Sequence, residues 1–331
     1  MKRVGNLYEK IISIENPELA DRKARKGKGN TYGIKLHDKD KESNILKLHH
    51  ALKDKNFKTS EYRVFKIYEP KERDIYQLPY YPDRIVHHAV MNVLEDIWVN
   101  TFTIDSYSCI KKRGIHGVLR NMKKALKDRD NTKYCLKLDI KKYYPSIDHC
   151  ILKKIIRKKI KDKDLLDLLD EIIDSTIGVP IGNYLSQYFA NLYLTYFDHW
   201  LKEELKVKYY FRYADDMVIF SPGKEYLHGL LVQINNYISE NLNLCLKGNY
   251  QIFPVEARGL DFVGYVFRHD YILMRKSIKQ RMCKKVAKLR KTGISEIELV
   301  HKISSWTGWA GHCNSRNLTN KLNINYGKSR I

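Results

Sequence analysis

The alternation of apolar and polar residues predicts a chain of helices interrupted by a few short strands. Residues 1–60 carry apolar positions at helical spacing in a basic background, and a second helix is expected at 45–52. Alternation over 62–68, and again over 136–141, indicates strands. In the second of these, Asp139 falls on the face opposite the apolar side chains, which leaves its carboxylate available to a site.

A hairpin with acidic residues at its tip is predicted at 209–220, where two aromatic-rich runs flank Ala214, Asp215 and Asp216. Asp139 could then meet Asp215 across neighbouring strands. An isolated pair of aspartates is usually a solvated turn. Two carboxylates on a tight turn also repel each other unless a cation lies between them, and Mg²⁺ held by carboxylates and substrate phosphates is the form found in polymerases. The rest of the chain decides between these interpretations.

Composition points to a folded protein with a polyanionic partner. The 331 residues, 43% of them hydrophobic, are enough for two or three packed subdomains. The formal charge of +23 favours nucleic acid over a membrane surface, because no stretch approaches the ~18 apolar residues of a membrane span. The N-terminus lacks the apolar core of a signal peptide, so we expect a cytoplasmic protein. Six scattered cysteines without a CxxC pair indicate neither a zinc site nor a disulfide framework.

Three motifs in order resemble those of reverse transcriptases: Asp139 with Tyr144, the turn at 178–187, and the Tyr-Ala-Asp-Asp (YADD) motif at 213–216. The similarity runs from about Tyr62 to the C-terminus. It implies an α+β right-hand polymerase of fingers, palm and thumb, with an RRM/ferredoxin-like palm sheet and a helical thumb. The expected parts are a basic helical N-terminal extension at 1–60, fingers at 61–135, a palm at 136–270 with part of the fingers around 150–177, and a helical thumb at 271–331.

The resemblance also implies the chemistry, that of an RNA-directed DNA polymerase from a bacterium or phage with two Mg²⁺ ions, for which Mn²⁺ can substitute. Asp139, Asp215 and Asp216 are the implied catalytic residues, and they bind the metals together with the carbonyl of Ile140. Tyr144 occupies the steric-gate position, where an aromatic ring excludes a 2′-hydroxyl, so the implied substrates are dNTPs. The implied macromolecular ligands are template RNA and the RNA/cDNA duplex.

Further positions are expected to contact the substrates. A triphosphate needs basic side chains around it, and a duplex suits lysines at helical spacing on a thumb helix. The candidates for nucleotide binding are Lys71, Arg73, Arg84, Arg113, Tyr144, Ile181 and Gly182; those for template or primer are Gln187, Phe262, Gly264, Tyr265, Lys284, Lys285 and Lys288. Two alternatives stay open: Arg113 as a surface arginine, and the basic run at 21–30 as either a solvated face or a phosphate-tracking arm for template RNA.

Ile181 departs from the usual reverse transcriptase motif, which has glutamine before Gly182 and ends in Ser-Pro rather than Ser186-Gln187. An apolar side chain cannot make the hydrogen bonds of an amide, so discrimination among incoming bases should weaken. These features resemble the reverse transcriptases of diversity-generating retroelements, which copy a template-repeat RNA with errors at adenines to diversify a protein gene. That family implies a small basic oligomeric accessory protein and no membrane partner.

Three other interpretations stay open. Ile181 could be a neutral variant in an accurate enzyme. The chain could be an antiphage-defence, retron-like or group-II-type reverse transcriptase of ordinary fidelity, or a non-catalytic RNA-binding module with a polymerase fold.

Overall fold

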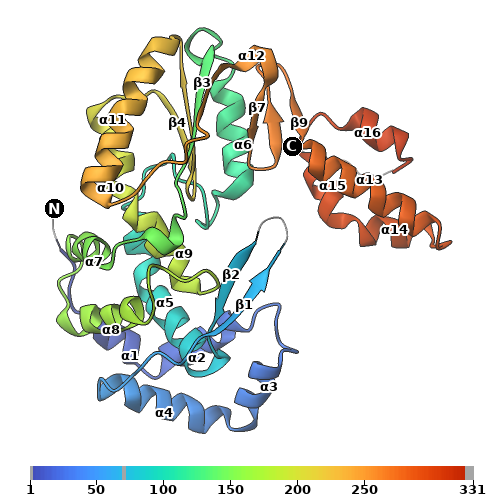
Figure 1. Ribbon diagram of the computed structural model, residues 1–331. Coiled ribbons are helices and arrows are strands. Elements are labelled where there is room, and N and C mark those ends of the chain that lie inside the picture. The colour runs from blue at the N-terminus through green and yellow to red at the C-terminus, as the bar shows by residue number, and fades with distance from the viewer. Residues whose placement is uncertain (1–2, 69–71, 325–331) are drawn as a thin grey trace. The chain divides into compact units, whose positions relative to one another are not determined.

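The computed structural model describes residues 3–68 and 72–324, which form helices and strands in an α+β arrangement (Figure 1). The chain divides into two compact units, between which it passes several times. Unit 1 comprises Met1–Cys109, Ile140–Lys206 and Gln233–Lys247, and unit 2 comprises Ile110–Asp139, Val207–Val232 and Gly248–Ile331. The predicted boundaries of N-terminal extension, fingers, palm and thumb stay a prediction.

Unit 1 is mainly helical and carries one antiparallel hairpin, β1–β2. Its core lies around α5, whose apolar side chains are buried against α1, α2 and α9. The elements are α1 (Tyr8–Ile12), α2 (Glu15–Ala24), α3 (Tyr32–Lys39), α4 (Lys41–Lys53), β1 (Arg63–Ile67), β2 (Arg73–Gln77), η1 (Tyr80–Arg84), α5 (Ile85–Val99), η3 (Tyr144–Ser146), α7 (His149–Arg157), α8 (Lys163–Asp174), α9 (Tyr184–Tyr193), α10 (Thr195–His199), η4 (Trp200–Glu204) and the second half of α11 (Lys224–Leu242).

Unit 2 contains two antiparallel sheets and a set of helices. The first sheet has the strand order β4-β5-β3-β6, and the second has the order β7-β8-β9. The elements are α6 (Gly114–Ala125), η2 (Asp130–Thr132), β3 (Tyr134–Asp139), β4 (Tyr209–Tyr213), β5 (Asp216–Ser221), the first half of α11, β6 (Gln251–Pro254), α12 (Val255–Arg258), β7 (Leu260–Phe262), β8 (Tyr265–Phe267), β9 (Ile272–Met274), α13 (Lys276–Arg290), α14 (Glu296–Lys302), α15 (Ser304–Gly311) and α16 (Arg316–Lys321).

Several local expectations are confirmed. The helix at 45–52 lies within α4, and the strand at 62–68 pairs with β2. Asp148 caps α7 by accepting a hydrogen bond from the amide of Ile151 at 3.0 Å. The C-terminal helices of unit 2 enclose a core of their own, against which Trp306 and Trp309 pack as expected.

The alternating leucines of 241–248 also predict a strand, and this prediction is wrong. Helix α11 continues to Leu242, and Asn243 then has a φ of 49°, a left-handed conformation that asparagine tolerates at a helix end. Within the described residues of this stretch, only Leu246 pairs like a strand, through an isolated bridge to Ile140. The alternating leucines produced the false prediction, because Leu242 and Leu244 are buried although the segment after α11 is irregular.

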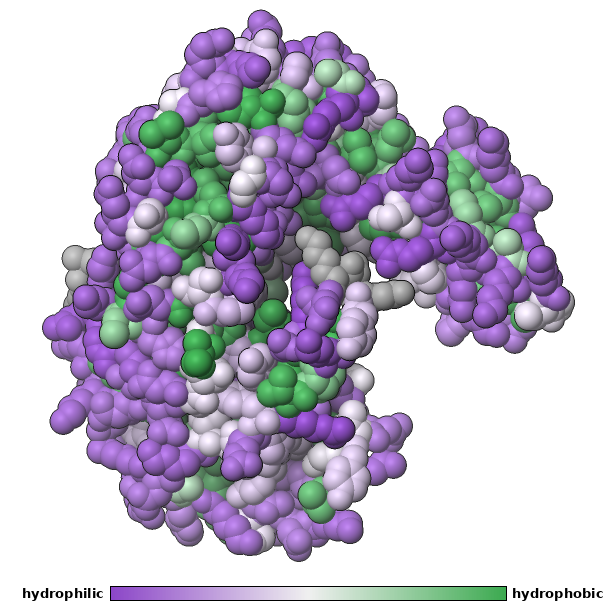
Figure 2. Space-filling model, in the orientation of Figure 1, coloured by the Kyte–Doolittle hydropathy of each residue, from purple (hydrophilic) through white to green (hydrophobic). Residues whose placement is uncertain are grey.

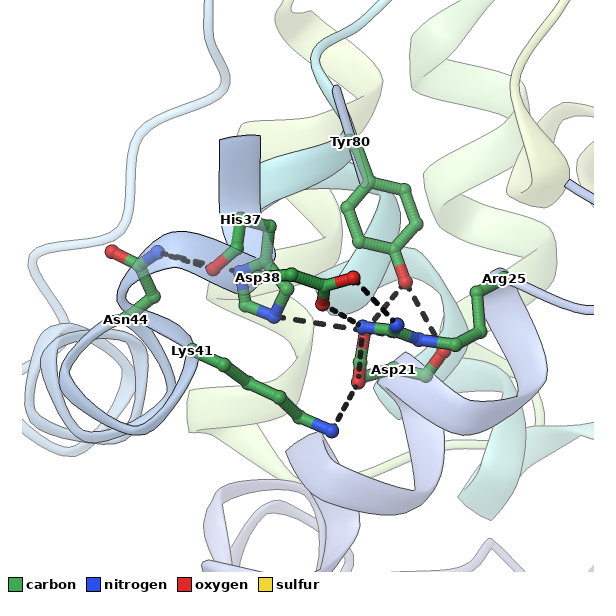
Figure 3. Close-up of polar contacts among 7 residues, drawn as sticks. All are labelled: Asp21, Arg25, His37, Asp38, Lys41, Asn44 and Tyr80. Atoms are coloured by element: carbon green, nitrogen blue, oxygen red, sulfur yellow. Dashed lines mark hydrogen bonds and ion pairs between the residues drawn. The ribbon is translucent and has the colours of Figure 1, made fainter. Parts of the chain in front are cut away.

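The basic run at 21–30 is partly structural, because it begins with a buried polar cluster (Figure 3). Asp21 is 0% exposed and accepts hydrogen bonds from the Arg25 guanidinium at 2.8 Å and from the Tyr80 hydroxyl at 2.5 Å. The ammonium of Lys41 lies 3.1 Å from the same carboxylate. Burial alone would raise the pKa of Asp21, but these bonds outweigh burial and lower it. Arg25 therefore belongs to the fold, while the exposed lysines that follow it leave both interpretations open.

Replacing Asp21 by asparagine should destabilise unit 1 by about 2 kcal/mol, because two cations and a tyrosine lose their buried ionic partner. The folded pKa of Asp21 is depressed, so its stabilising effect is complete above the ordinary aspartate range and disappears only as pH falls through the folded value. Thermal unfolding at pH 5 to 8 should thus show a constant deficit. Asp38→Asn is the control, since Asp38 pairs with the same Arg25 but is 41% exposed, and should cost less than about 1 kcal/mol. A larger deficit for Asp38→Asn would contradict this assignment.

The surface is largely hydrophilic in the face shown in Figure 2, in keeping with the high charge. Among the residues described, no helix has the length and apolar character needed to cross a membrane.

Candidate active site

The predicted carboxylates lie at one end of the first sheet of unit 2. Strand β3 ends at Asp139, which is the direct Cα partner of Asp216 at the start of β5. Strands β4 and β5 form the predicted hairpin, with Ala214 and Asp215 at its turn and Ala214 at a φ of 56°. Leu136 and Leu138 are buried on one face of β3, and Asp139 on the other is half-buried, as the alternation predicts.

Negative charges repel one another at this end of the sheet when no cation is bound. Burial raises the pKa of Asp215 to about 7, and the charge of Asp139, the charge of Asp216 and a hydrogen bond with Asp139 add to the increase. Asp215 is therefore only partly ionised near neutral pH when no cation lies beside it. A positive ion between Asp139 and Asp215 would relieve the repulsion and lower the pKa of Asp215 again.

The donor set fits a hard divalent cation that is completed by substrate. Within residues 3–68 and 72–324, no group of three or more His, Cys, Asp or Glu side chains could enclose an ion by itself. Polymerase sites do not need one, since one or two carboxylates with substrate phosphates hold Mg²⁺ there. Asp139 and Asp215 provide such a pair of oxygen ligands. Ile140 follows Asp139 and is bridged to Leu246, and a role for its carbonyl stays a prediction.

Arg212 was not among the predicted site residues, yet it is fully buried on β4 at 0% exposure. Its guanidinium donates a hydrogen bond to the carbonyl of Ala214 at 3.1 Å and so steadies the turn that carries Asp215. The sequence signal for a buried arginine was its place inside a run of tyrosines and phenylalanines. A strand buried on both faces has no exposed position for a charged residue.

In unit 1 the glycine-rich turn before α9 packs on the segment that carries Tyr144. The carbonyl of Tyr144 accepts a hydrogen bond from the amide of Val179 at 2.9 Å. Gly178 has a φ of 63°, and a Cβ there would lie 2.6 Å from the carbonyl oxygen of Pro145. The ring of Tyr144 is half-buried and meets Tyr143 edge-on at 5.6 Å.

The same turn also holds the hairpin β1–β2. The amide of Tyr76 on β2 donates to the carbonyl of Ile181 at 2.8 Å. Gly182 has a φ of 128°, and a Cβ there would lie 2.6 Å from the carbonyl oxygen of Tyr76. Unit 1 thus brings Ile181, Gly182 and the hairpin into direct contact through backbone groups.

The basic candidates belong to different elements of the two units. Lys71 lies outside the described residues. Arg73 is exposed at the start of β2, and Arg84, at the end of η1, lines a cavity of about 670 Å³ in unit 1. Arg113 belongs to unit 2, where it precedes α6. The sequence also predicts His87 and His88, at the start of an apolar run, to be packing or capping residues, and both pack: His87 is buried in α5, and His88 stacks on Tyr184 at 4.2 Å.

The template and primer candidates occupy different kinds of position. Gln187 is exposed on α9, and Lys284, Lys285 and Lys288 are exposed on α13. Phe262 and Tyr265 are each 1% exposed, and the Tyr265 hydroxyl donates to the carbonyl of Trp309 at 3.1 Å. These two rings stabilise the hairpin from inside. Gly264 lies at the turn between them with a φ of 87°, and a primer contact for Phe262, Gly264 and Tyr265 stays a prediction.

Residues 70–266 match the sequence profile of the family described as reverse transcriptase (RNA-dependent DNA polymerase). The chain belongs to this family. The resemblance stated from the motifs is confirmed at the level of the reverse transcriptase family.

Among curated relatives, Protein YkfC of Escherichia coli is 25% identical over 233 residues, which cover 57% of this chain and 61% of that protein. Group II intron-encoded protein LtrA of Lactococcus lactis is 26% identical over 181 residues, covering 51% of this chain and 30% of LtrA. The chain thus spans less than two thirds of these relatives. The solved telomerase of Candida albicans in complex with a fragment of telomeric RNA shares the fold, with a TM-score of 0.51 at 13% identity over 72% of this chain and 52% of that chain.

Proposed function

We propose that the protein is an RNA-directed DNA polymerase that extends a primer on an RNA template. The observation that carries this proposal is the pair Asp139 and Asp215, with its raised Asp215 pKa, inside a chain of the reverse transcriptase family. Extension of a DNA primer on RNA by the purified protein, dependent on Mg²⁺ or Mn²⁺, tests it.

In the reaction, the primer 3′-oxygen forms a bond to the α-phosphorus of the incoming dNTP, and the bond to the β-phosphate oxygen breaks, releasing pyrophosphate. Bound divalent ions would lower the pKa of the 3′-hydroxyl and neutralise the leaving group. Asp139 and Asp215 would hold these ions through their carboxylate oxygens, and Asp216 would support them through its pairing with Asp139. The chemistry then consists mainly of positioning and charge neutralisation.

The assignment to fingers, palm and thumb is part of the proposal. Support for an RRM/ferredoxin-like palm comes from the order of elements, in which β3, helices, β4, β5, α11 and β6 follow a βαββαβ pattern with spatial order β4-β5-β3-β6. The hairpin β1–β2, whose basic residues include Arg73, would belong to the fingers. The helical end of unit 2, with exposed lysines on α13, would be the thumb.

The finer proposal is error-prone copying of a template-repeat RNA at adenines, with a small basic oligomeric accessory protein as partner. Its support is Ile181, whose backbone is fixed by Tyr76 while its half-buried side chain offers no hydrogen bond. The similarity to the group II intron-encoded protein LtrA favours the alternative, a group-II-type enzyme of ordinary fidelity.

Replacing Ile181 by glutamine should restore an amide donor and acceptor and lower misincorporation opposite template adenine by about tenfold, equivalent to one hydrogen bond of about 1.4 kcal/mol. Sequencing of cDNA made on a defined RNA measures this. Ile181→Leu is the matched control, because it stays apolar and should keep the wild-type error spectrum. Accurate wild-type cDNA, or an error spectrum that ignores Ile181→Gln, would favour the enzyme of ordinary fidelity.

A further inference from the structure

Three polar residues of unit 2 connect the strand of Asp139 to the helix that follows the second sheet. Lys137 lies two residues before Asp139 on β3, and therefore on the same face. Its Nζ donates a hydrogen bond of 2.7 Å to the carbonyl oxygen of Asp261 on β7. The second sheet thus lies within the reach of one lysine side chain from the face that carries Asp139.

The link continues through the side chain of Asp261. Its Oδ1 accepts a hydrogen bond of 2.7 Å from the Nε of Arg275 and forms an ion pair with the Nη2 of Arg275 at 2.5 Å. Arg275 immediately precedes α13, the helix with the exposed lysines. Lys137, Asp261 and Arg275, which we call the three-residue link, therefore join β3, β7 and α13 in series.

The backbone clamps the hairpin turn to the same helix. The amide of Arg275 donates to the carbonyl of Gly264 at 3.0 Å, and Tyr265 pairs with Met274 across β8 and β9. Gly264 has no room for a side chain, since a Cβ there would meet the Trp309 ring and lie 3.0 Å from Cδ1 of Ile278. The turn at Val263 and Gly264 is consequently fastened to the start of α13 by backbone and packing contacts.

The exposure of the link argues for a geometric role. Arg275 is 38% and Asp261 is 47% exposed, and ion pairs so exposed contribute little to stability. The Arg275–Asp261 ion pair can instead fix the distance between Asp139 and the turn at Val263 and Gly264. Its two-nitrogen contact and the hydrogen bond from Lys137 leave little freedom between these two points.

We propose that Lys137, Asp261 and Arg275 are positioning residues that hold the turn at Val263 and Gly264 in register with Asp139, so that the primer end is presented to the catalytic carboxylates. The inference rests on the proposed function and adds how the primer end is located. None of the three residues touches the reacting atoms; they act through the turn.

Primer extension with Lys137→Met, Arg275→Ala and the exchanged pair Asp261→Arg/Arg275→Asp tests this. Each of the first two should raise the KM for primer–template about tenfold, the equivalent of one charged hydrogen bond, and shorten the product made per binding event. The Mg²⁺ concentration for half-maximal rate and the Tm should stay at wild-type values. The exchanged pair should recover most of the loss of Arg275→Ala.

Two controls come from exposed ion pairs of the same unit. Lys133, one residue before β3, lies 3.4 Å from Asp130, and Arg129 lies 3.1 Å from Glu256. Lys133→Met and Arg129→Ala should leave the KM unchanged. Lys137→Arg keeps a donor and should resemble the wild type even if Lys137→Met does not fold.

Wild-type KM values for Lys137→Met and Arg275→Ala would overturn the inference. So would a loss that the exchanged pair fails to recover, or one that follows the Tm or the Mg²⁺ dependence, because these would indicate a merely structural role. A wild-type protein that makes no product would instead contradict the proposed function, before any variant is compared.

Discussion

Asp215→Asn is expected to lower primer extension by roughly 10³-fold or more, because it removes a negative oxygen ligand where the transition state needs a cation. Asparagine is nearly isosteric, so the hairpin β4–β5 should form as before. The loss should appear in kcat with saturating dNTP and primer, as expected for an interaction made mainly in the transition state. Single-turnover extension on an RNA template measures it.

The same substitution should stabilise the metal-free protein at alkaline pH. The folded pKa of Asp215 is raised to about 7 by burial and by its neighbours. Ionised Asp215 therefore costs stability above that pH, and the cost fades as pH falls towards the ordinary aspartate pKa. Asp215→Asn should therefore raise the Tm at pH 8 and leave it unchanged near pH 4. The gain in the free energy of unfolding at pH 8 should be on the order of 1 kcal/mol, because the turn is partly exposed and solvent screens its charges.

Added Mg²⁺ should reverse this difference, since it would stabilise the wild type more than the variant. A matched control is Asp270→Asn, a surface carboxylate of unit 2 that is 71% exposed and should alter neither property. If Asp215→Asn kept normal activity, or if its Tm advantage grew at low pH, the assignment of Asp215 as a metal-binding carboxylate with a raised pKa would be wrong.

Gly182→Ala is expected to lower kcat/KM for dNTP incorporation by about 100-fold. The φ of 128° at this position is one that residues with a side chain rarely adopt. A Cβ would also lie 2.6 Å from the Tyr76 carbonyl oxygen and 3.2 Å from Cγ2 of Ile75. The hairpin would have to move away, and a displacement of about 1 Å in a positioning element is enough for an effect of this size.

Steady-state extension at varied dNTP concentration measures this change, and thermal unfolding should show a loss of about 1–3 kcal/mol from the strained backbone. Gly248→Ala provides the comparison, because a Cβ there meets no atom within 4 Å and no left-handed φ is required. Wild-type dNTP kinetics for Gly182→Ala would show that the contact between the hairpin and the turn plays no part in nucleotide use.

Local patterns were sufficient for much of the site. The alternation around Leu136, Leu138 and Asp139 predicts β3 and its faces, because a half-buried strand has a period of two residues. The aromatic runs around Asp215 predict the hairpin. The expected meeting of Asp139 with Asp215 is found in the interaction of their carboxyl groups, while the Cα partner of Asp139 is Asp216.

The long-range polar contacts could not be predicted in the same way. Lys137 and Asp261 are 124 residues apart, and Asp21 and Tyr80 are 59 apart. Each pairing depends on which surfaces the whole fold brings together, and a lysine or an aspartate in a charged chain offers many equivalent partners. Arg212 could be predicted in part. Its apolar neighbours indicated that the strand is buried, but they did not indicate that Arg212 binds the carbonyl of Ala214.

Primer extension by the purified protein tests the central claim most directly. A labelled DNA primer annealed to an RNA of defined length is incubated with dNTPs and Mg²⁺, alongside Asp139→Asn. Full-length cDNA from the wild type, its absence with EDTA, and loss of roughly 10³-fold in the variant are the predicted results. Absence of cDNA with either Mg²⁺ or Mn²⁺, or equal product from Asp139→Asn, would contradict the assignment of polymerase activity to these carboxylates.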